Sequence, residues 1–371
     1  MPRRLPQNKR LISTLIPVLM MRGAHYKRAA CQRLTLARES RCLSLICGIY
    51  PMPNPDLSPT AYLATLADKQ LLLVKGPDAS KFLQGQVTCD VKELTAPVTR
   101  IGAQCNPKGR ILLSFRALQM DSETIALRIP ASMLESAQKT LGKYIVFSKA
   151  KLHQGTDAFA LFGLFGESAA AVASTFFTQL PTEQDGWVEH RGSYLIQLAA
   201  DRFECWIALA ERDHFLDAVT KQTQSMDAQA WQLLDIASGI ADVYPESYEL
   251  FTPQELNYQL INGINFRKGC YTGQEIVARL HYRGKLKRHM YRFEYTADKI
   301  PAPGTAVVNS LSGQQAGAVV MAARNQSGKI ELLASLLDEQ LDQASVADAT
   351  EKLSPRNLPY AIPTADDAPI Q

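Results

Sequence analysis

The residue in this sequence with the clearest capacity for chemistry is Cys270, in the segment KGCYTGQE that spans residues 268–275. Gly269 and Gly273 flank it, so the backbone there can take conformations that other residues rarely reach. Residues 274–280 have a helical pattern, so the thiol precedes a helix N-terminus, and a lysine lies two positions before it. Both neighbours favour a thiolate, which suits nucleophilic, redox or metal-transfer chemistry. A buried cysteine in a tight turn is the structural alternative.

Strands and short helices are predicted well before this segment. Residues 70–75 (QLLLVK) predict a strand, and Asp78 in the turn that follows is suited to cap a short helix. Residues 99–118 predict a hairpin with its turn at 106–109, because alternate residues of the second half are apolar. A strand over 124–129 and an amphipathic helix over 131–141, ended by Gly142, complete this block.

A second block repeats this style. Strands are predicted over 159–165, 194–198 and 203–209, and helices over 168–180, 212–222 and 228–240. Hairpins mixed with helices in this way are typical of an α+β fold rather than a doubly wound sheet. From Arg288 onward, short alternating segments separated by Pro-Gly and Ser-Gly turns predict a small all-β barrel or sandwich.

The charge of the chain is unevenly distributed. The net charge is +4, yet residues 1–50 hold ten Lys or Arg and one acid, a net +9. The remaining 321 residues therefore carry −5, so the body of the protein gives no general sign of nucleic-acid affinity. Residues 1–50 fit three alternatives: an extension upstream of a start at Met52, an organelle presequence, or a secretory signal. Their apolar run over 11–21 is too short to span a membrane.

The cysteines do not form a disulfide or metal framework. There are seven, an odd number, and no two form a CxxC pair. This usage suits a reducing compartment and argues against a four-thiolate site. The histidines have no ligand spacing with the cysteines, so no metal site is predicted.

The residues around Cys270, FRKGCYTGQEIVARLHYRGKLKR, closely resemble the signature of the YgfZ family. This is a family of folate-binding proteins linked to iron–sulfur cluster maintenance and tRNA modification, related to the glycine cleavage T-protein, an aminomethyltransferase. Further matching segments are 82–90, 106–110, 143–149, Trp231 and 358–360. The resemblance covers about residues 60–360.

The resemblance implies a T-protein-like α+β fold. Two interlocked domains would surround a tetrahydrofolate, and a C-terminal β-barrel would close the site. The ranges that we expect are 1–51 for a basic extension, disordered or not native, and 60–152 with 228–284 for the folate-binding domain that carries KGCYTGQE. A second α+β domain would span 153–227, and the barrel and tail would span 285–371.

The resemblance also assigns site residues. Cys270 is the reactive thiol, and the motif residues around it are Lys268, Gly269, Tyr271, Gly273, Gln274 and Glu275. Trp231 would stack on the folate, although a Trp on a helical stripe is also typical of a core. Lys69 stands near where the family has a second folate-contacting aromatic, which weakens the site unless the lysine meets a folate carboxylate.

Polar residues on other segments could complete a folate site. Gln84 and Gln86 could read the pterin edge, with solvation at the surface as the equal alternative. Arg279 and Arg283 could face the folate glutamates, with a solvated helix face as the alternative.

These matches predict a tetrahydrofolate-binding protein that supports iron–sulfur cluster assembly or repair and, through it, tRNA processing and modification. The expected partners are folate, iron–sulfur proteins or assembly factors, and tRNA-modifying enzymes. We expect a monomer without membrane contact, in the cytoplasm, or in the mitochondrial matrix if residues 1–50 are a presequence.

Two alternatives belong to other classes. Aminomethyl transfer needs a carboxylate near the folate nitrogen, and the matching strand over 109–115 contains no acid. Direct tRNA binding is indicated by the basic residues that alternate with His and Tyr between Arg279 and Arg292. A solvated face, or cations that meet folate glutamates, explains the same run, and the net acidic body favours that interpretation.

Overall fold

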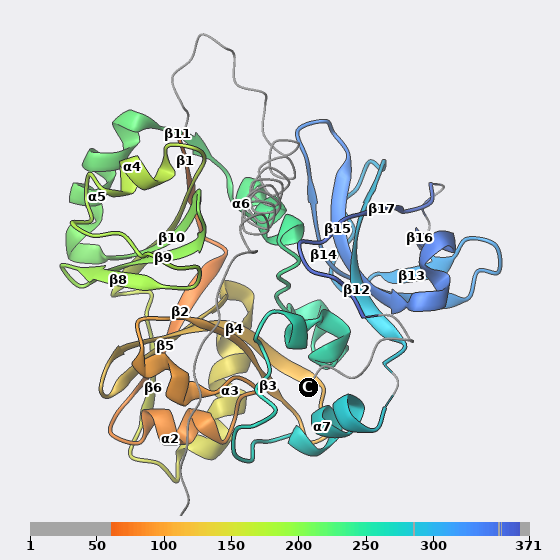
Figure 1. Cartoon of the computed structure of the whole chain (residues 1–371), viewed down its shortest axis with the longest axis horizontal. Helices are drawn as coiled ribbons and strands as arrows, with labels where there is room; N and C mark the ends of the chain where they lie inside the picture. Colours follow the sequence, from red (N-terminus) through yellow and green to blue (C-terminus); the bar gives the residue numbers. More distant parts are fainter. Residues whose placement is uncertain (1–60, 285, 348, 350, 364–371) are drawn as a thin grey trace, which may run out of the picture. The chain divides into compact units, whose positions relative to one another are not determined.

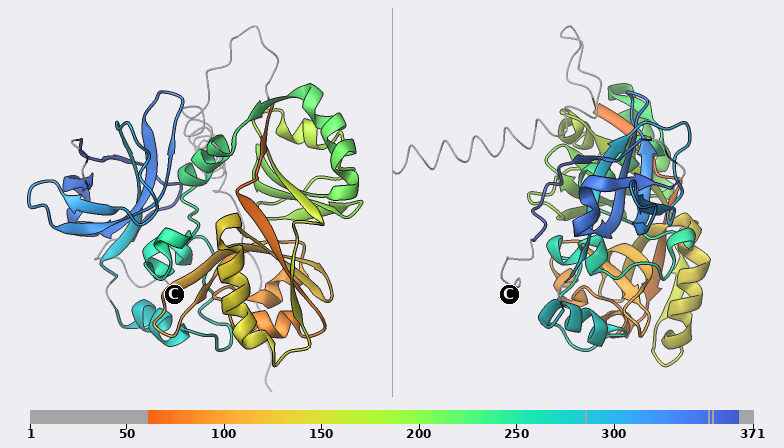
Figure 2. Two further views of the ribbon diagram at one scale, coloured as in Figure 1. Left: turned by 180° about the vertical axis from the view of Figure 1, so that it is seen from behind. Right: turned by 90° about the vertical axis from the view of Figure 1, so that its right-hand side faces the viewer.

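The computed structural model describes residues 61–284, 286–347, 349 and 351–363, which form three sheets with short helices packed on them (Figures 1 and 2). The predictions for residues 1–51 lie outside these ranges. The α+β fold class is confirmed. Within the described part of the chain, no helix combines the length and apolar character needed to cross a membrane.

The five-stranded sheet has the strand order β3-β4-β5-β2-β6, and its strands are antiparallel. Their bounds are β2 Lys69–Lys75, β3 Arg100–Cys105, β4 Ile111–Asp121, β5 Thr124–Pro130 and β6 Lys151–Gln154. The predicted strands and the hairpin of this block are confirmed. The hairpin turns where the amide of Gly109, at φ +71°, donates to the Asn106 carbonyl at 2.9 Å.

Two helices of this block differ from the prediction. Asp78 precedes α2, Ala79–Gln84, but its carboxylate accepts from the Lys149 amide at 2.8 Å rather than capping the helix. Helix α3, Leu134–Ile145, follows a 3-10 turn and runs through Gly142, which was predicted to end it. The helix continues because Ile145 reaches the core.

The six-stranded sheet has the order β11-β1-β7-β10-β9-β8. Its strands are β1 Ala61–Thr65, β7 Phe159–Phe165, β8 Trp187–His190, β9 Ser193–Ala199, β10 Arg202–Ala208 and β11 Thr223–Met226. Strand β1 precedes the five-stranded sheet in sequence, yet it pairs with β7 and β11 of this one. The two sheets are therefore interlocked by the chain path.

Helices α4, Ala169–Ala173, and α5, Arg212–Val219, pack on this sheet. The helix predicted over 168–180 is much shorter than expected, because Phe176 and Phe177 turn into the core beside Phe215.

The C-terminal sheet is antiparallel, with the order β16-β13-β14-β15-β12-β17, and it curls into a half-barrel (Figure 2). Its strands are β12 Arg288–Tyr295, β13 Ala306–Asn309, β14 Gln315–Arg324, β15 Ile330–Leu337, β16 Ala344–Val346 and β17 Ser354–Arg356. The all-β character predicted for this part is confirmed.

Helix α6, Ala228–Ala237, connects the sheets. The largest apolar cluster contains Leu71 of β2, Trp206 of β10, Trp231 of α6 and Val320 of β14. The inner faces of the first two sheets, α6 and one face of the half-barrel therefore share one core. The predicted site residues lie in or around this core.

Candidate functional site

The KGCYTGQE segment forms a loop that runs into helix α7, Gln274–Tyr282. The helix predicted after Gly273 is confirmed. Cys270 is exposed, whereas the other three cysteines of the described residues are buried. A thiol at the surface of a fixed loop can be reached by a partner, and a buried one cannot.

The side chain of Lys268 attaches this loop to the segment that contains Val87 and Cys89. Its side chain is buried, and its ammonium donates to the carbonyls of Val87 at 2.7 Å and Cys89 at 2.6 Å. Burial lowers the pKa of Lys268 to about 8, although the nearby Cys89 and Asp90 partly oppose that shift. These contacts of Lys268 fix the loop. That Lys268 also favours the thiolate form of Cys270 stays a prediction.

The glycines of the loop and of the hairpin turn differ in whether a larger residue could replace them. Gly273 has φ +85°, and a Cβ there would come within 2.5 Å of the Asn106 carbonyl oxygen. Gly269 has open space where its Cβ would be. Gly109 is close to Ile276, and a Cβ on Gly109 would lie 3.0 Å from the Ile276 side chain. The start of α7 therefore sits directly on the hairpin turn.

Hydrogen bonds bring the family-like segments together. The hydroxyl of Thr88 donates to the Gly263 carbonyl at 2.6 Å, and the Asn265 amide donates to the Thr88 carbonyl at 2.9 Å. The Thr272 amide donates to the Gly85 carbonyl at 3.2 Å. Together with the packing of Gly273 against Asn106, these bonds join the three segments 82–90, 106–110 and 268–275 into one structural unit around Cys270.

The remaining motif residues support this unit. Tyr271 is buried, and desolvation raises its pKa, while the Lys268 ammonium lies 5.2 Å from its ring centroid. The Gln274 amide donates to the Tyr271 carbonyl at 3.1 Å, and Glu275 is exposed in the first turn of α7. Tyr271 thereby anchors the segment that exposes its neighbour Cys270.

The two predicted glutamines have different environments. Gln84 donates to the Asp90 carboxylate at 2.9 Å and accepts from the Val91 amide at 2.8 Å, so it stabilises the chain after α2. Gln86 has a buried side-chain oxygen without a hydrogen-bond partner among the described residues. Gln86 is therefore the better placed of the two to accept from a ligand.

Lys69 belongs to a buried charge network that the sequence did not predict. Its ammonium lies 3.0 Å from Asp242, whose carboxylate also accepts from Arg128 at 2.9 Å and Ser114 at 3.1 Å. Burial opposes a charged Asp242, but Lys69 and Arg128 hold its pKa down to about 2. Burial also opposes a charged Lys69, yet Tyr244 and Asp242 raise its pKa well above the usual value.

Glu204 of β10 extends the network to the second sheet. It is fully buried, and one carboxylate oxygen lies 3.2 Å from Arg128 and accepts from the Trp206 indole at 2.8 Å. Its other oxygen, Oε2, is buried without a partner among the described residues. A buried anionic oxygen of this kind needs a donor, so Glu204 is a candidate ligand contact.

Trp231 has the surroundings of a core residue. It is 2% exposed, and the Arg202 guanidinium lies 4.0 Å from its ring centroid and is held by Asp235 at 2.6 Å. A Cβ on Gly163 would clash with the same ring. A folate stacked on this ring would therefore have to displace Arg202.

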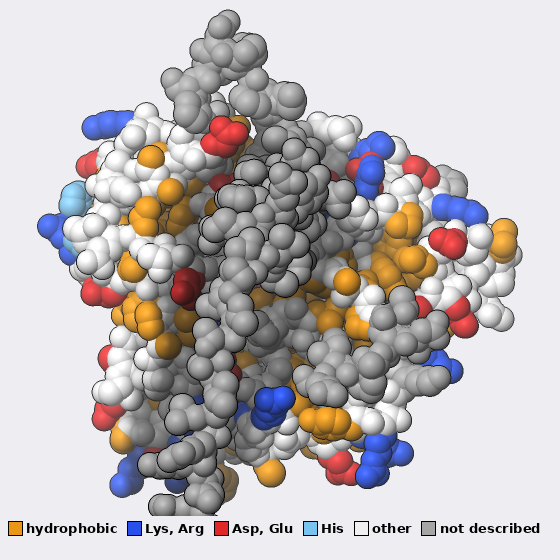
Figure 3. Space-filling view, viewed as in Figure 1, with side chains coloured by type: hydrophobic (Ala, Val, Ile, Leu, Met, Phe, Trp, Pro, Cys, Tyr) orange, Lys and Arg blue, Asp and Glu red, His pale blue; other side chains and the backbone are white. Residues whose placement is uncertain are grey.

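The basic-aromatic run is split by the structure. Arg279 and Arg283 are exposed on or just after α7. In β12, by contrast, His289 lies 2.8 Å from Asp338, and Arg292 is buried beside Glu331 at 2.5 Å. His289 and Arg292 are therefore not part of one exposed basic surface with Arg279 and Arg283. Lys and Arg side chains on the face in Figure 3 form small separate groups rather than one field.

The buried network had a weak signal in the sequence. Glu204 and Arg128 are single charges inside apolar strand segments, FECWIA and TIALRI, where a charge facing the core needs a partner. Within the described residues, no group of three or more His, Cys, Asp or Glu side chains is arranged to hold a metal ion.

Comparison with curated proteins finds relatives that match most of the chain. The tRNA-modifying protein YgfZ of Serratia proteamaculans (strain 568) is 33% identical over 327 residues, which cover 84% of this chain and 98% of the relative. The same protein of Pectobacterium carotovorum subsp. carotovorum (strain PC1) is 32% identical over 320 residues, 84% of this chain and 95% of the relative. No family model matches the sequence.

The solved structures give a matching fold. Glycine cleavage system aminomethyltransferase T from Bartonella henselae superposes with a TM-score of 0.59 over 75% of this chain and 78% of that one. The sequence identity is 15%, so this likeness shows the fold alone. The T-protein-like fold predicted from the sequence is confirmed.

Proposed function

This chain belongs to the family of tRNA-modifying proteins YgfZ, and from that premise we propose that it binds tetrahydrofolate and supports iron–sulfur cluster assembly or repair. Through the iron–sulfur enzymes that it serves, it supports tRNA modification. Cys270 is the reactive thiol, and its partners are iron–sulfur proteins or assembly factors and tRNA-modifying enzymes. We place this activity in the cytoplasm.

The observation that carries the proposal is the presentation of Cys270. Three segments converge on its loop, the Lys268 ammonium ties it to two carbonyls, and Gly273 fits against the hairpin turn. The loop nevertheless leaves the sulfur exposed. A thiol that is both fixed in place and accessible suits exchange of a cluster or of a sulfur ligand with a partner protein.

The residues between the two interlocked sheets fit a folate. A pterin ring presents neighbouring N–H donors, and Glu204 offers a buried carboxylate oxygen that lacks one. Lys69 and Arg128 hold the Asp242 carboxylate in its charged form, and Arg128 also lies 3.2 Å from Glu204. When bound, a folate would supply a one-carbon carrier, and the chain's own residues would orient the pterin edge.

Aminomethyl transfer has less support from the same residues. Asp242 does place a carboxylate at Ser114 of β4, within the segment 109–115 that contains no acid of its own. Both of its oxygens are engaged, however, and its pKa of about 2 makes it a poor base at neutral pH. An assay with aminomethylated carrier protein and tetrahydrofolate is expected to show no turnover.

A complementation experiment tests the role of Cys270. Cells that lack the endogenous protein would express the wild type, Cys270→Ala, Cys270→Ser or Lys299→Ala, the last an exposed control far along the chain. We expect both thiol variants, and not the control, to lose iron–sulfur enzyme activities and iron–sulfur-dependent tRNA modifications. Wild-type activities in the two thiol variants, at equal protein level, would remove Cys270 from the mechanism.

Calorimetric titration of the purified full chain tests the folate site separately. Tetrahydrofolate is expected to bind, and Glu204→Gln is expected to weaken binding at least about tenfold, since a lost charge-assisted hydrogen bond is worth more than about 1 kcal/mol. Glu246→Gln, at an exposed position, is the matched control. Thermal melting of each variant separates lost binding from lost folding. Unchanged affinity in a folded Glu204→Gln protein would exclude this site.

A further inference from the structure

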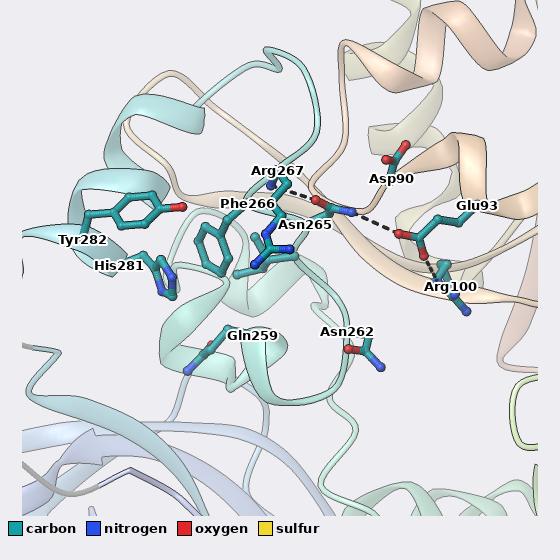
Figure 4. A pocket seen from close by; sticks show the side chains of 11 residues that line it. Asp90, Glu93, Arg100, Gln259, Asn262, Asn265, Phe266, Arg267, His281 and Tyr282 are labelled. Atoms are coloured by element: carbon teal, nitrogen blue, oxygen red, sulfur yellow. Dashed lines mark hydrogen bonds and ion pairs between the residues drawn. The ribbon is translucent and has the colours of Figure 1, made fainter. Parts of the chain in front are cut away.

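A cavity of about 390 Å³ lies next to the KGCYTGQE loop, and no residue of the buried charge network lines it. Figure 4 shows aromatic side chains on one side of it and charged side chains on the other, with Arg267 between them. Its lining includes Phe266, His281, Tyr282, Gln259, Arg267 and Glu93. Neither the Cys270 chemistry nor the folate site uses any of these side chains.

The aromatic side is a preformed platform. Phe266 and His281 are stacked, with ring centroids 3.7 Å apart and an angle of 10° between the planes. Tyr282 stands edge-on to both rings, at 72° and 76°, and is 63% exposed. A flat platform with an exposed ring at its edge is typical of sites on which single-stranded bases stack.

The polar floor has an unused acceptor. The side-chain oxygen of Gln259 is buried and has no hydrogen-bond partner among the described residues. A glutamine amide presents an acceptor and a donor side by side, which matches the amino group and ring nitrogen of adenine. The cavity therefore favours a base that donates from one edge position and accepts at the next.

The lining of the cavity is balanced in charge, with Asp90 and Glu93 against Arg100 and Arg267, so an anionic chain would be bound by the exposed arginines at its rim. Glu93 is neutralised by Arg100 at 2.6 Å and also accepts from Asn265 at 3.0 Å. Arg267 is exposed at the cavity and forms no ion pair within the described part of the chain, and the same holds for Arg279 and Arg283 near Tyr282. Exposed guanidinium groups of this kind bind phosphates.

We propose that this cavity receives an unpaired base of an RNA loop, with adenine preferred. Arg267, Arg279 and Arg283 would bind the flanking phosphates. The inference rests on the proposed function, which connects this chain to tRNA modification through iron–sulfur enzymes. It adds that the chain binds the tRNA directly. It places the RNA contact on the residues that lead into and follow the Cys270 loop, at 266–267 and 281–283.

The test uses short fluorescent oligonucleotides and the full-length protein. In anisotropy titrations an oligoadenylate is expected to bind more tightly than an oligouridylate, and its affinity falls as salt rises. Tyr282→Ala is expected to weaken oligoadenylate binding about tenfold, as loss of a stacking ring does elsewhere. Gln259→Ala is expected to make the affinities for oligoadenylate and oligouridylate equal. Phe147→Ala, at another exposed aromatic, and Lys299→Ala, at an exposed cation, are controls and should bind like the wild type.

Tetrahydrofolate titrated into the same variants separates this inference from the proposed function. Weak oligonucleotide binding with normal folate binding in Tyr282→Ala and Gln259→Ala supports the inference. Undetectable oligonucleotide binding by the wild type, or equal binding by the wild type and both variants, overturns it without touching the Cys270 proposal. Folate affinity that falls with these variants while oligonucleotide binding stays constant would assign the cavity to folate and also overturn it.

Discussion

The ammonium of Lys268 illustrates how one residue can have a structural role inside a functional motif. It donates to the carbonyls of Val87 and Cys89, which lie in the segment that follows α2. Its burial lowers the pKa to about 8. A neutral amine can still donate to both carbonyls, so the loop keeps its anchor when the charge is lost.

The titration of Lys268 gives a stability prediction with a definite sign. Because its folded pKa of about 8 is below the usual value of 10.5, the unfolded chain binds the additional proton between these pH values. The free energy of unfolding of the wild type should therefore rise with pH across that interval, relative to Lys268→Met. Urea unfolding of both proteins at the two ends of the interval, about pH 8 and pH 10.5, measures the difference. A difference that stays constant or falls with pH would contradict the prediction.

The loss of the Lys268 side chain should itself be costly. Lys268→Met takes the ammonium donor away from two carbonyls, and we expect it to lower the free energy of unfolding by about 2–4 kcal/mol. Lys108→Met, in the exposed hairpin turn, is the matched control and should change it by less than about 0.5 kcal/mol. Equal effects of the two substitutions would show that the carbonyl contacts do not stabilise the loop.

At the scale of elements, the start of α7 depends on one glycine. Gly273 is left-handed, and its position against the Asn106 carbonyl leaves no room for a Cβ. Gly269, four residues earlier in the same motif, is in open space. The two glycines look alike in the sequence, and the structure separates a required one from a replaceable one.

Paired substitutions test this difference. Gly273→Ala is expected to destabilise the protein by about 2 kcal/mol or more, since both backbone strain and a clash with backbone must be relieved. Gly269→Ala is expected to be close to neutral, within about 0.5 kcal/mol. Thermal and urea unfolding of both variants provide the comparison, and a Gly269→Ala protein less stable than Gly273→Ala would contradict it.

Local patterns were enough to predict most elements but not their ends. Short strand-like segments predicted β2 and β5, alternation predicted β4, and the helical pattern after Gly273 predicted α7. Gly142 was a poor stop signal, because the glycine that commonly ends a helix adopts a positive φ, and Gly142 is absent from the positive-φ glycines. The helix after Ser168 was predicted to be too long. The chain leaves the helix after Ala173, and Phe176 packs against Phe215 of α5.

At the scale of the whole described molecule, the buried charge network joins parts that local sequence cannot connect. Lys69 and Asp242 are separated by 173 positions, and Arg128 and Asp242 by 114. Each charge comes from a different strand or loop, so no spacing rule could pair them. The Cys270 motif could be recognised because its residues are contiguous, whereas the network exists only after the two sheets interlock.

Asp242 is the residue on which this network depends, so its removal should be costly. Asp242→Asn leaves the buried cations Lys69 and Arg128 without compensation and is expected to lower the free energy of unfolding by roughly 3–5 kcal/mol. Adding Lys69→Met should recover part of that loss, because it removes one uncompensated charge, and the two effects should be non-additive. Urea unfolding of the two single variants and the double variant measures the coupling, and strictly additive effects would contradict it.

The same carboxylate predicts the acid side of the stability curve. Its pKa of about 2 lies below the usual value of 3.8, so its contribution is complete above the higher value and disappears as pH falls through the lower one. The difference in unfolding free energy between wild type and Asp242→Asn should therefore shrink as pH falls from 3.8 to about 2. Asp298→Asn, at an exposed position, is the control. A difference that is independent of pH over this interval would mean that Asp242 is not the charged partner of Lys69 and Arg128.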